Sequence, residues 1–440
     1  MDALTVRVLW RLAAGAAALV GVALMLIGAL SVTRGTPVER VRALSADGRR
    51  AAAPAVASPL FARTMTLYTG AALAGGNAVE VLANGDGTYP PLWRDLRAAR
   101  RSIAVQLYYA RPGAVADTMA AVLAERARAG VRVLLVLDAF GSEPLSEGWR
   151  DSLRAAGVAV SELRRLRWYK LNRATSRSHV RAITIDGVIG YAGGFGLADY
   201  WLGDGHTDGE WRETNVRVRG PAVAELQAAF ATAWAEATGE LLTGEFFFPP
   251  ATLDSAGPAR AALLFTAPPK GSTPAERFLA LSIAAARRTL YVTNAYFLPD
   301  DDFRRFLCAA RARGVDVRVL TAGTRTDITS VYYASRYRYP TLLGCGVRLY
   351  EYQPAMVHAK TLVVDGLWSA VGSMNFDNRS LALNNEANLV ALDATVGATL
   401  DSLFLDDLRY AREVTAPAFA DRPWWHRPVE AGAALLSRVL

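Results

Sequence analysis

The chain has 440 residues, and this length predicts more than one domain. Hydrophobic residues make up 52% and charged residues 20%, which excludes a disordered, collagen-like or wholly membrane-embedded protein. Two cysteines, Cys308 and Cys345, are too few for a disulfide framework, and we expect both to be buried thiols. Four histidines leave little room for a histidine-built metal cluster.

The formal net charge is +8, and arginine carries nearly all of the positive charge, because only three of the 49 basic residues are lysines. A basic surface of this size favours an anionic partner. Phospholipid headgroups and nucleic acid phosphates both fit this description.

The first element of the chain is a hydrophobic segment. Residues 12–32 hold no charge, and 21 residues of helix span about 31 Å, close to the thickness of a bilayer core. We predict a single-pass anchor over residues 1–34, with a cleaved signal peptide as the alternative. More arginines follow the segment than precede it, which places the body on the cytoplasmic side. Residues 35–76 are predicted to be a linker.

The rest of the chain alternates apolar strands with amphipathic helices and also repeats itself. Residues 99–105 resemble 286–292, and residues 126–133 resemble 311–317. A repeat of this length predicts two homologous domains. We place them at 77–245 and 271–425, separated by a linker at 246–270 and followed by a tail at 426–440. The aromatic run 246–248 is expected to fill the seam between the domains or to dip into a membrane.

Both halves carry one pattern of chemically active residues. A histidine is followed by a basic residue two positions later, by an aspartate seven positions later, and by a glycine seven positions after that. The residues are His179, Arg181, Asp186 and Gly193-Gly194-Phe195-Gly196 in the first half, and His358, Lys360, Asp365 and Gly372-Ser373-Met374-Asn375 in the second.

This pattern suits a phosphate group. A histidine and a cation two residues apart on a strand point to the same face. The cation can bind phosphate oxygens while the imidazole acts at phosphorus or on an oxygen. The two aspartates precede glycines, so they are either catalytic or turn residues that brace the strand.

Further polar residues extend the repeat. Glu213 and Glu386 occupy equivalent positions and either hold an imidazole N–H or form surface salt bridges. Ser373 and Asn375 are candidate donors to a bound phosphate, with Gly194 at the equivalent turn of the first half.

Together these motifs resemble the phospholipase D superfamily, with its duplicated H-x-K-x4-D signature, over residues 77–425. Within it the chain is most similar to bacterial cardiolipin synthases. The resemblance implies two α/β/α sandwich domains about a pseudo-twofold axis, with the site at their seam and neither metal nor cofactor. It implies phosphatidyl transfer in which His179 forms a phosphohistidine while His358 acts as acid and then base. The implied partners are a phospholipid membrane and an anionic phospholipid substrate, and no nucleic acid.

The chain departs from the family pattern at four positions of the first half. They are Arg181 for lysine, Gly196 for asparagine, Asn215 for histidine and Gln106 for glutamate. These departures keep three alternatives open: a phospholipase D that uses water, a nuclease of the same superfamily, and a degenerate lipid-binding scaffold. The stretch 168–173 is a further candidate, for gating the site or binding lipid.

Overall fold

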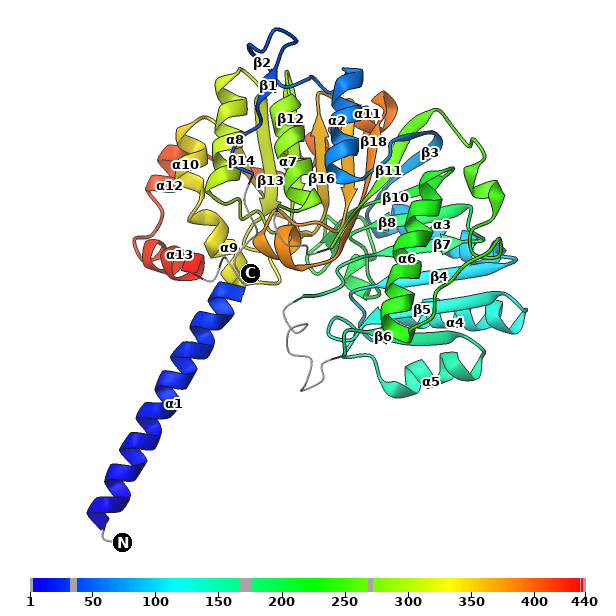
Figure 1. Cartoon of the computed structure of the whole chain (residues 1–440), viewed down its shortest axis with the longest axis horizontal. Coiled ribbons are helices and arrows are strands. Elements are labelled where there is room, and N and C mark those ends of the chain that lie inside the picture. The colour runs from blue at the N-terminus through cyan, green and yellow to red at the C-terminus, as the bar shows by residue number, and fades with distance from the viewer. Residues whose placement is uncertain (1–2, 32–37, 166–175, 268–271, 436, 438–440) are drawn as a thin grey trace.

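A computed structural model describes residues 3–31, 38–165, 176–267, 272–435 and 437. Its body is built on one mixed sheet of fifteen strands covered by helices (Figure 1). The strand order is β19-β14-β13-β12-β16-β17-β18-β11-β3-β10-β8-β7-β4-β5-β6. The first half of the sequence supplies one end of this sheet, and the second half supplies the other.

The first half contains seven strands of the large sheet and four α-helices. The strands are β3 (Ala74–Ala83), β4 (Ser102–Leu107), β5 (Arg132–Asp138), β6 (Ala159–Leu163), β7 (Ala182–Ile185), β8 (Ile189–Gly193) and β10 (Thr214–Arg219). The helices are α3 (Asn84–Ala98), α4 (Ala114–Arg128), α5 (Glu147–Ala155) and α6 (Ala222–Thr238). β4, β5 and β6 run parallel, and β4 is buried along its whole length, as expected for a strand covered on both faces.

The second half repeats this order and adds one strand. Its strands are β11 (Ala259–Thr266), β12 (Thr289–Asn294), β13 (Asp316–Ala322), β14 (Arg348–Tyr352), β16 (Lys360–Val364), β17 (Trp368–Gly372), β18 (Glu386–Leu392) and β19 (Ala411–Val414). Its helices are α7 (Pro274–Ala285), α8 (Asp301–Ala312), α9 (Thr329–Arg336), α10 (Tyr339–Gly344), α11 (Ala394–Asp407), α12 (Ala416–Ala420) and α13 (His426–Leu435). α7 begins with a capping box formed by Thr273 and Glu276.

The two halves meet where β3 pairs antiparallel with β11, through Asn77 with Ala259 and Ala74 with Ala261. From this junction outward the two arms of the sheet follow the same order of equivalent strands. A shared hydrophobic cluster beneath the junction includes Val218 and Leu226 of the first half with Leu389 and Leu400 of the second. This arrangement confirms the predicted pair of α/β units related by a pseudo-twofold axis.

The segment predicted as a linker contains ordered structure. Helix α2 (Pro59–Thr69) lies within residues 35–76, begins at the N-cap Ser58, and packs against α7. Its Phe61 is buried, with the ring 5.2 Å from that of Trp368. The linker expected at 246–270 likewise contains β11, which belongs to the sheet of the second half.

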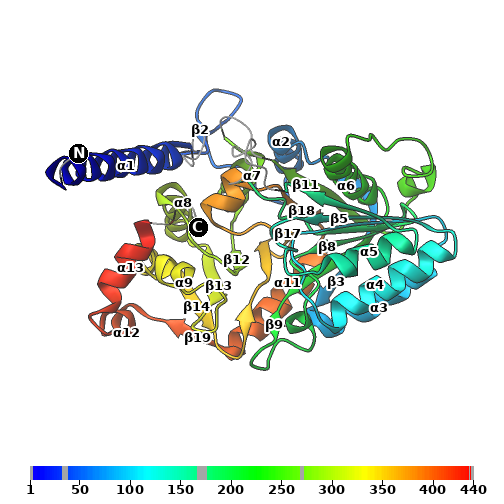
Figure 2. The same ribbon diagram turned by 90° about the horizontal axis from the view of Figure 1, so that it is seen from below.

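Helix α1 (Ala3–Ser31) projects away from the body in both views (Figures 1 and 2). The window Val8–Met25 is long and apolar enough to cross a membrane, and no part of it is buried against the protein. This matches the expectation of an N-terminal apolar helix.

The prediction of two buried thiols is wrong. Cys308 of α8 and Cys345, directly after α10, form a disulfide with their Cα atoms 5.5 Å apart. Both side chains are only half-buried. A spacing of 37 residues gave no sequence signal for this bond, because the packing of α10 on α8 brings the cysteines together.

Two further segments differ from a simple linker and tail. Phe247 packs against a cluster of the first half that includes Phe230 and Trp234, so it covers this half and not the seam. In the tail, α13 packs on α9 and buries Glu430, which forms ion pairs with Arg422 and Arg336.

Candidate active site

Both motif histidines line one cavity of about 460 Å³ between the two halves. Its walls are aromatic and basic, with carboxylate and amide groups near the second-half motif. The lining residues include Tyr108, Tyr109, Arg177, His179, Arg181, Trp201, Trp211, Tyr296, His358, Asn375, Asp377 and Arg379. The volume is in the range of small-molecule sites.

His179 is held by the second half of the chain. An isolated parallel bridge joins Ser178 to Asn385, and the His179 backbone N–H donates to the Asn385 carbonyl at 2.9 Å. This pairing sets the ring beside Glu386, the first residue of β18. The Nδ1 atom of His179 lies 2.9 Å from one carboxylate oxygen of Glu386 and 3.1 Å from the other.

His358 is held in the same way by the first half. Strand β15 (Met356–Val357) pairs in parallel with β9 (Trp211–Arg212), and the His358 backbone N–H donates to the Arg212 carbonyl at 2.7 Å. The His358 Nδ1 atom then lies 2.5 Å from an oxygen of Glu213. The expectation that Glu213 and Glu386 contact imidazoles is confirmed, and each contact crosses between the halves.

These contacts prepare the imidazoles for chemistry at the opposite ring nitrogen. An ionised glutamate accepts a hydrogen bond from Nδ1–H, which leaves Nε2 with its lone pair. His358 helps to lower the pKa of Glu213 to about 2. Burial instead raises the pKa of Glu386 to about 8, a shift that the hydrogen bond from Ser373 and the charge of Arg181 oppose. Burial and the neighbouring Arg181 hold the pKa of His179 well below its usual value. Burial and Lys360 lower the pKa of His358 to about 3. Both rings are therefore neutral at pH 7 without substrate.

The two motif cations are buried next to their own histidines. Arg181 donates from Nη1 to the His179 carbonyl at 2.9 Å and from Nε to the Phe195 carbonyl at 3.1 Å. Lys360 donates from Nζ to the His358 carbonyl. Burial, with Arg181 nearby, lowers the pKa of Lys360 to about 7, although Glu213 opposes this shift. The site thus concentrates positive charge that a phosphate would neutralise.

Gly194 and Ser373 were predicted to bind substrate, but they contact the two glutamates instead. The Ser373 hydroxyl donates to a Glu386 oxygen at 2.5 Å. At the equivalent position, a Cβ on Gly194 would lie 2.4 Å from an oxygen of Glu213. Neither residue lines the cavity. Among the residues predicted to contact phosphate directly, Asn375 does line it, and its buried Oδ1 has no hydrogen-bond partner among the described residues.

Gly196, where the family pattern has asparagine, makes room for an indole ring. A Cβ on Gly196 would lie 2.6 Å from a ring carbon of Trp201 and 2.8 Å from the Tyr109 carbonyl. Trp201 is buried against His358, with ring centroids 5.4 Å apart, and its Nε1 lies 3.3 Å from Glu213. The Trp201 ring therefore occupies the space beside position 196, where the family pattern has an asparagine.

Two other departures have structural roles. Asn215 accepts hydrogen bonds through Oδ1 from the Gly194 and Phe195 N–H groups, at 3.0 and 3.3 Å. Gln106 donates to the hydroxyl of Ser178, the residue before His179, at 2.9 Å. Asn215 therefore holds the turn at Gly194, and Gln106 holds the residue next to His179. The candidate stretch 168–173 lies outside the described residues.

Asp186 and Asp365 do not line the cavity, and their contacts favour the alternative that they are turn residues that brace the strand. Each adopts a positive φ in a tight turn, 54° and 55° respectively. The Asp186 carboxylate accepts from the backbone N–H groups of residues 100, 101 and 102, and Asp365 accepts from those of 287, 288 and 289. They brace the turn at the far end of β7 and β16, seven residues from the histidines.

The aromatic walls were not found from the sequence. Tyr109 and Tyr296 occupy equivalent positions, each two residues beyond the end of a central parallel strand, β4 or β12. In α/β folds, ligand sites lie at the carboxyl ends of parallel strands, so the positions of these two tyrosines could have been predicted from the sequence.

Asp377 also lines the cavity, and burial raises its pKa to about 7. Among the described residues, no cluster of three or more histidine, cysteine or carboxylate ligands is placed to hold a metal ion.

Comparisons with known proteins agree with this geometry. A family model described as "Cardiolipin synthase, PLD-like domain" matches residues 279–408. The chain is 36% identical to cardiolipin synthase of Geobacillus kaustophilus (strain HTA426) over 362 residues, which cover 82% of this chain and 72% of that protein. It is 33% identical to cardiolipin synthase A of Pseudomonas putida (strain GB-1) over 371 residues, 83% of this chain and 75% of that one.

Among solved structures, the crystal structure of phosphatidylserine synthase from Haemophilus influenzae Rd KW20 superposes with a TM-score of 0.66. It covers 86% of this chain and all of that one at 11% identity, so it supports the fold alone. The duplicated motif, its assembly in one cavity and the identity to these relatives lead to one conclusion: the chain belongs to the cardiolipin synthase family of the phospholipase D superfamily.

Proposed function

We propose that this protein is a phosphatidyltransferase that makes cardiolipin from phosphatidylglycerol and a second phospholipid through a phosphohistidine. One observation carries the proposal. His179 and His358 line a single cavity, and each is fixed at Nδ1 by a glutamate from the opposite half. Two neutral imidazoles with their Nε2 atoms available provide a nucleophile and a proton carrier for one phosphorus atom.

In the first step, Nε2 of His179 attacks the phosphorus of phosphatidylglycerol. The P–N bond forms as the bond from phosphorus to the glycerol headgroup oxygen breaks. His358 donates a proton to that oxygen, so free glycerol leaves and a phosphatidyl group remains on His179. Splitting one displacement into two easier steps is the general gain of covalent catalysis.

In the second step, His358 accepts a proton from a headgroup hydroxyl of the second lipid. The resulting oxygen nucleophile attacks phosphorus, the P–N bond breaks, and cardiolipin leaves with His179 restored. With phosphatidylglycerol as the second lipid, each turnover converts two of its molecules into one cardiolipin and one glycerol.

The charges of the site support this cycle. Without substrate, burial and Lys360 keep His358 neutral, although Glu213 beside it favours a proton. A bound phosphodiester adds one negative charge next to Arg181 and Lys360. This charge offsets the two cations, so substrate binding raises the pKa of His358. The ring then takes up a proton from water at Nε2, and this is the proton that it donates to the leaving glycerol oxygen.

The test is incubation of the purified protein with vesicles of phosphatidylglycerol that carries labelled phosphate. Cardiolipin and glycerol support the proposal, whereas phosphatidic acid would indicate transfer to water. His179→Ala should abolish both product and covalent label. In His358→Ala the label should still attach to His179, but slowly. Label on His358 of the His179→Ala variant would overturn the assigned roles. No turnover by the wild-type chain would leave only a lipid-binding scaffold.

We also propose that α1 crosses the membrane once and holds the body at the cytoplasmic face. Arg34, Arg40, Arg42, Arg49 and Arg50 follow the apolar segment, against Arg7 and Arg11 before it. The Cys308–Cys345 disulfide favours the opposite orientation, with the body outside the cytoplasm, because such bonds persist mainly in oxidising compartments. Labelling of a single exposed cysteine distinguishes the two orientations. The variant carries Ala129→Cys, with both native cysteines replaced by alanine. A membrane-impermeant maleimide should label it only after permeabilisation of the cells.

A further inference from the structure

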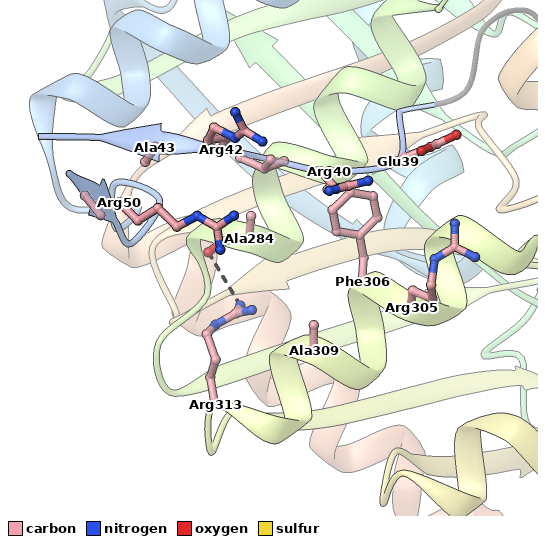
Figure 3. A pocket seen from close by; sticks show the side chains of 12 residues that line it. Glu39, Arg40, Arg42, Ala43, Arg50, Ala284, Arg305, Phe306, Ala309 and Arg313 are labelled. Carbon is pink, nitrogen blue, oxygen red and sulfur yellow. Dashed lines mark hydrogen bonds between the residues drawn. The ribbon is translucent and has the colours of Figure 1, made fainter. Parts of the chain in front are cut away.

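A second, larger cavity lies outside the candidate active site. It measures about 670 Å³ and is formed where residues 39–51 cross the outer face of α8 and the end of α7 (Figure 3). β1 (Ala43–Leu44) and β2 (Arg50–Ala51) form a small hairpin along one side. This cavity and the active-site cavity have no lining residue in common.

Arginine dominates the lining of this cavity. Five arginines face it, against one carboxylate, that of Glu39. They are Arg40, Arg42, Arg50, Arg305 and Arg313.

The arginines fall into two groups by their partners. Arg305 is ion-paired with Asp302, and Arg313 donates to the Ile283 carbonyl at 3.0 Å. The side chains of the other three, Arg40, Arg42 and Arg50, are exposed and make no hydrogen bond or ion pair with any described residue. Burial and the nearby Arg287 lower the pKa of Arg313, as expected where positive charges gather without enough counter-charge.

The floor of the cavity is apolar. Phe306 and Ala309 of α8 face it, and Val41 from the crossing segment packs onto the hydrophobic core beneath. Arg40 and Phe306 both line this cavity (Figure 3). A cavity with arginines at its rim and apolar side chains at its base suits an amphiphile with an anionic headgroup better than a free ion.

The cavity also lies close to the membrane anchor along the chain. Glu39 is eight residues beyond Ser31, the last residue of α1, and eight extended residues reach at most about 28 Å. Arginines near an anionic membrane surface are attracted to its headgroups. Lipid headgroups therefore lie within reach of the cavity whenever α1 is inserted.

We propose that this cavity is a non-catalytic binding site for the phosphate headgroup of an anionic phospholipid, held by Arg40, Arg42 and Arg50. The bound lipid would fix the catalytic body against the bilayer surface. The proposal rests on the proposed membrane anchor and is independent of the transfer reaction, because no motif residue takes part.

Photo-crosslinking of the full-length protein in vesicles tests this site. The probe is phosphatidylglycerol with a diazirine near the glycerol end of one acyl chain. The readout is label on the peptide that runs from Phe306 to Arg311, released by trypsin after reduction. The test variant is Arg40→Gln/Arg42→Gln/Arg50→Gln. Its matched control is Arg97→Gln/Arg132→Gln/Arg219→Gln, which removes the same charge from exposed, unpaired arginines of the first half.

Labelling of this peptide should titrate with the phosphatidylglycerol probe, with an affinity at least about tenfold weaker in the test variant and unchanged in the control. Equal labelling by a phosphatidylcholine probe, or equal labelling of both variants, would overturn the proposal. Complete competition by millimolar inorganic phosphate would also overturn it, by identifying a site for the free ion. Label on active-site peptides reports separately on the proposed function, and thermal unfolding confirms that both variants are folded.

Discussion

Nδ1 of His179, from the first half of the chain, lies 2.9 Å from the carboxylate of Glu386, from the second. His358 and Glu213 form the reciprocal contact. Each half therefore supplies a histidine and orients the histidine of the other. The pairing of Ser178 with Asn385, and of β15 with β9, fixes both contacts through the backbone. Neither half contains a complete site on its own, because each histidine is oriented by a glutamate of the other half.

We expect Glu386→Gln to reduce the rate of phosphohistidine formation by about 10²–10⁴-fold, because an amide no longer stabilises the tautomer and charge of His179. Single-turnover labelling of His179 measures this rate. Glu125→Gln, an exposed substitution on α4, is the control and should have no effect. If Glu386→Gln reduced only substrate affinity and left the labelling rate unchanged, the carboxylate would not orient His179.

The sequence was sufficient for the architecture and for part of the site. The repeated motif predicted two equivalent α/β units, and the family resemblance implied that His179 and His358 meet at their seam. It did not show which glutamate meets which histidine, because those contacts span 207 and 145 residues and depend on pairing between the halves.

Two features that the sequence left open or missed have physical explanations. The aspartates of the motif share its spacing, yet a strand separates them from the histidines, so Asp186 and Asp365 brace turns at the opposite end. A spacing motif gives positions along the chain and not distances in space. The Cys308–Cys345 disulfide was missed for the same reason, since helix packing and not sequence proximity joins the two residues.

Gly196→Asn restores the residue of the family motif, but we expect it to harm this protein. The new Cβ would overlap the Trp201 ring, and overpacking of this kind costs about 1–3 kcal/mol of unfolding free energy. Displacement of Trp201 from His358 and Glu213 should also lower turnover. Chemical denaturation and cardiolipin synthesis measure the two effects, with Gly75→Asn, at an exposed position with open space around it, as control.

A second substitution tests whether the indole causes this effect. Gly196→Asn/Trp201→Phe removes the ring atoms that would be overlapped, so it should be more stable than Gly196→Asn alone. A gain of activity in the single variant would instead show that the missing asparagine limits this enzyme.

The low pKa of Lys360 predicts that kcat/KM depends on pH. Its pKa of about 7 lies below the usual value of 10.5, so the ammonium loses its proton as the pH rises through 7 and phosphate binding weakens. We expect kcat/KM to fall above about pH 7, and kcat to fall only at higher pH, because bound phosphate raises the pKa of Lys360. Lys360→Arg retains its charge, so it should shift the kcat/KM decline upward. A decline that stays near pH 7 in this variant would assign the titration to another group.

The Cys308–Cys345 disulfide closes a 37-residue loop in the second half, and a loop of this size corresponds to about 3–4 kcal/mol of stabilisation. Cys308→Ser, Cys345→Ser and the double variant should all lose the same amount in chemical denaturation, because each removes the same bond. A reducing agent should destabilise the wild type equally and leave the variants unchanged.

Thiol counting after cells are lysed into a thiol-blocking reagent shows whether the bond forms in the cell. Two free thiols at that point, with a disulfide only after purification, agree with a cytoplasmic body. A bond already complete in the cell would place the catalytic body on the oxidising side of the membrane and reverse the proposed orientation of α1. In that case the arginines after α1 would lie at the outer surface, and the headgroup site beside them would draw its lipid from the outer leaflet.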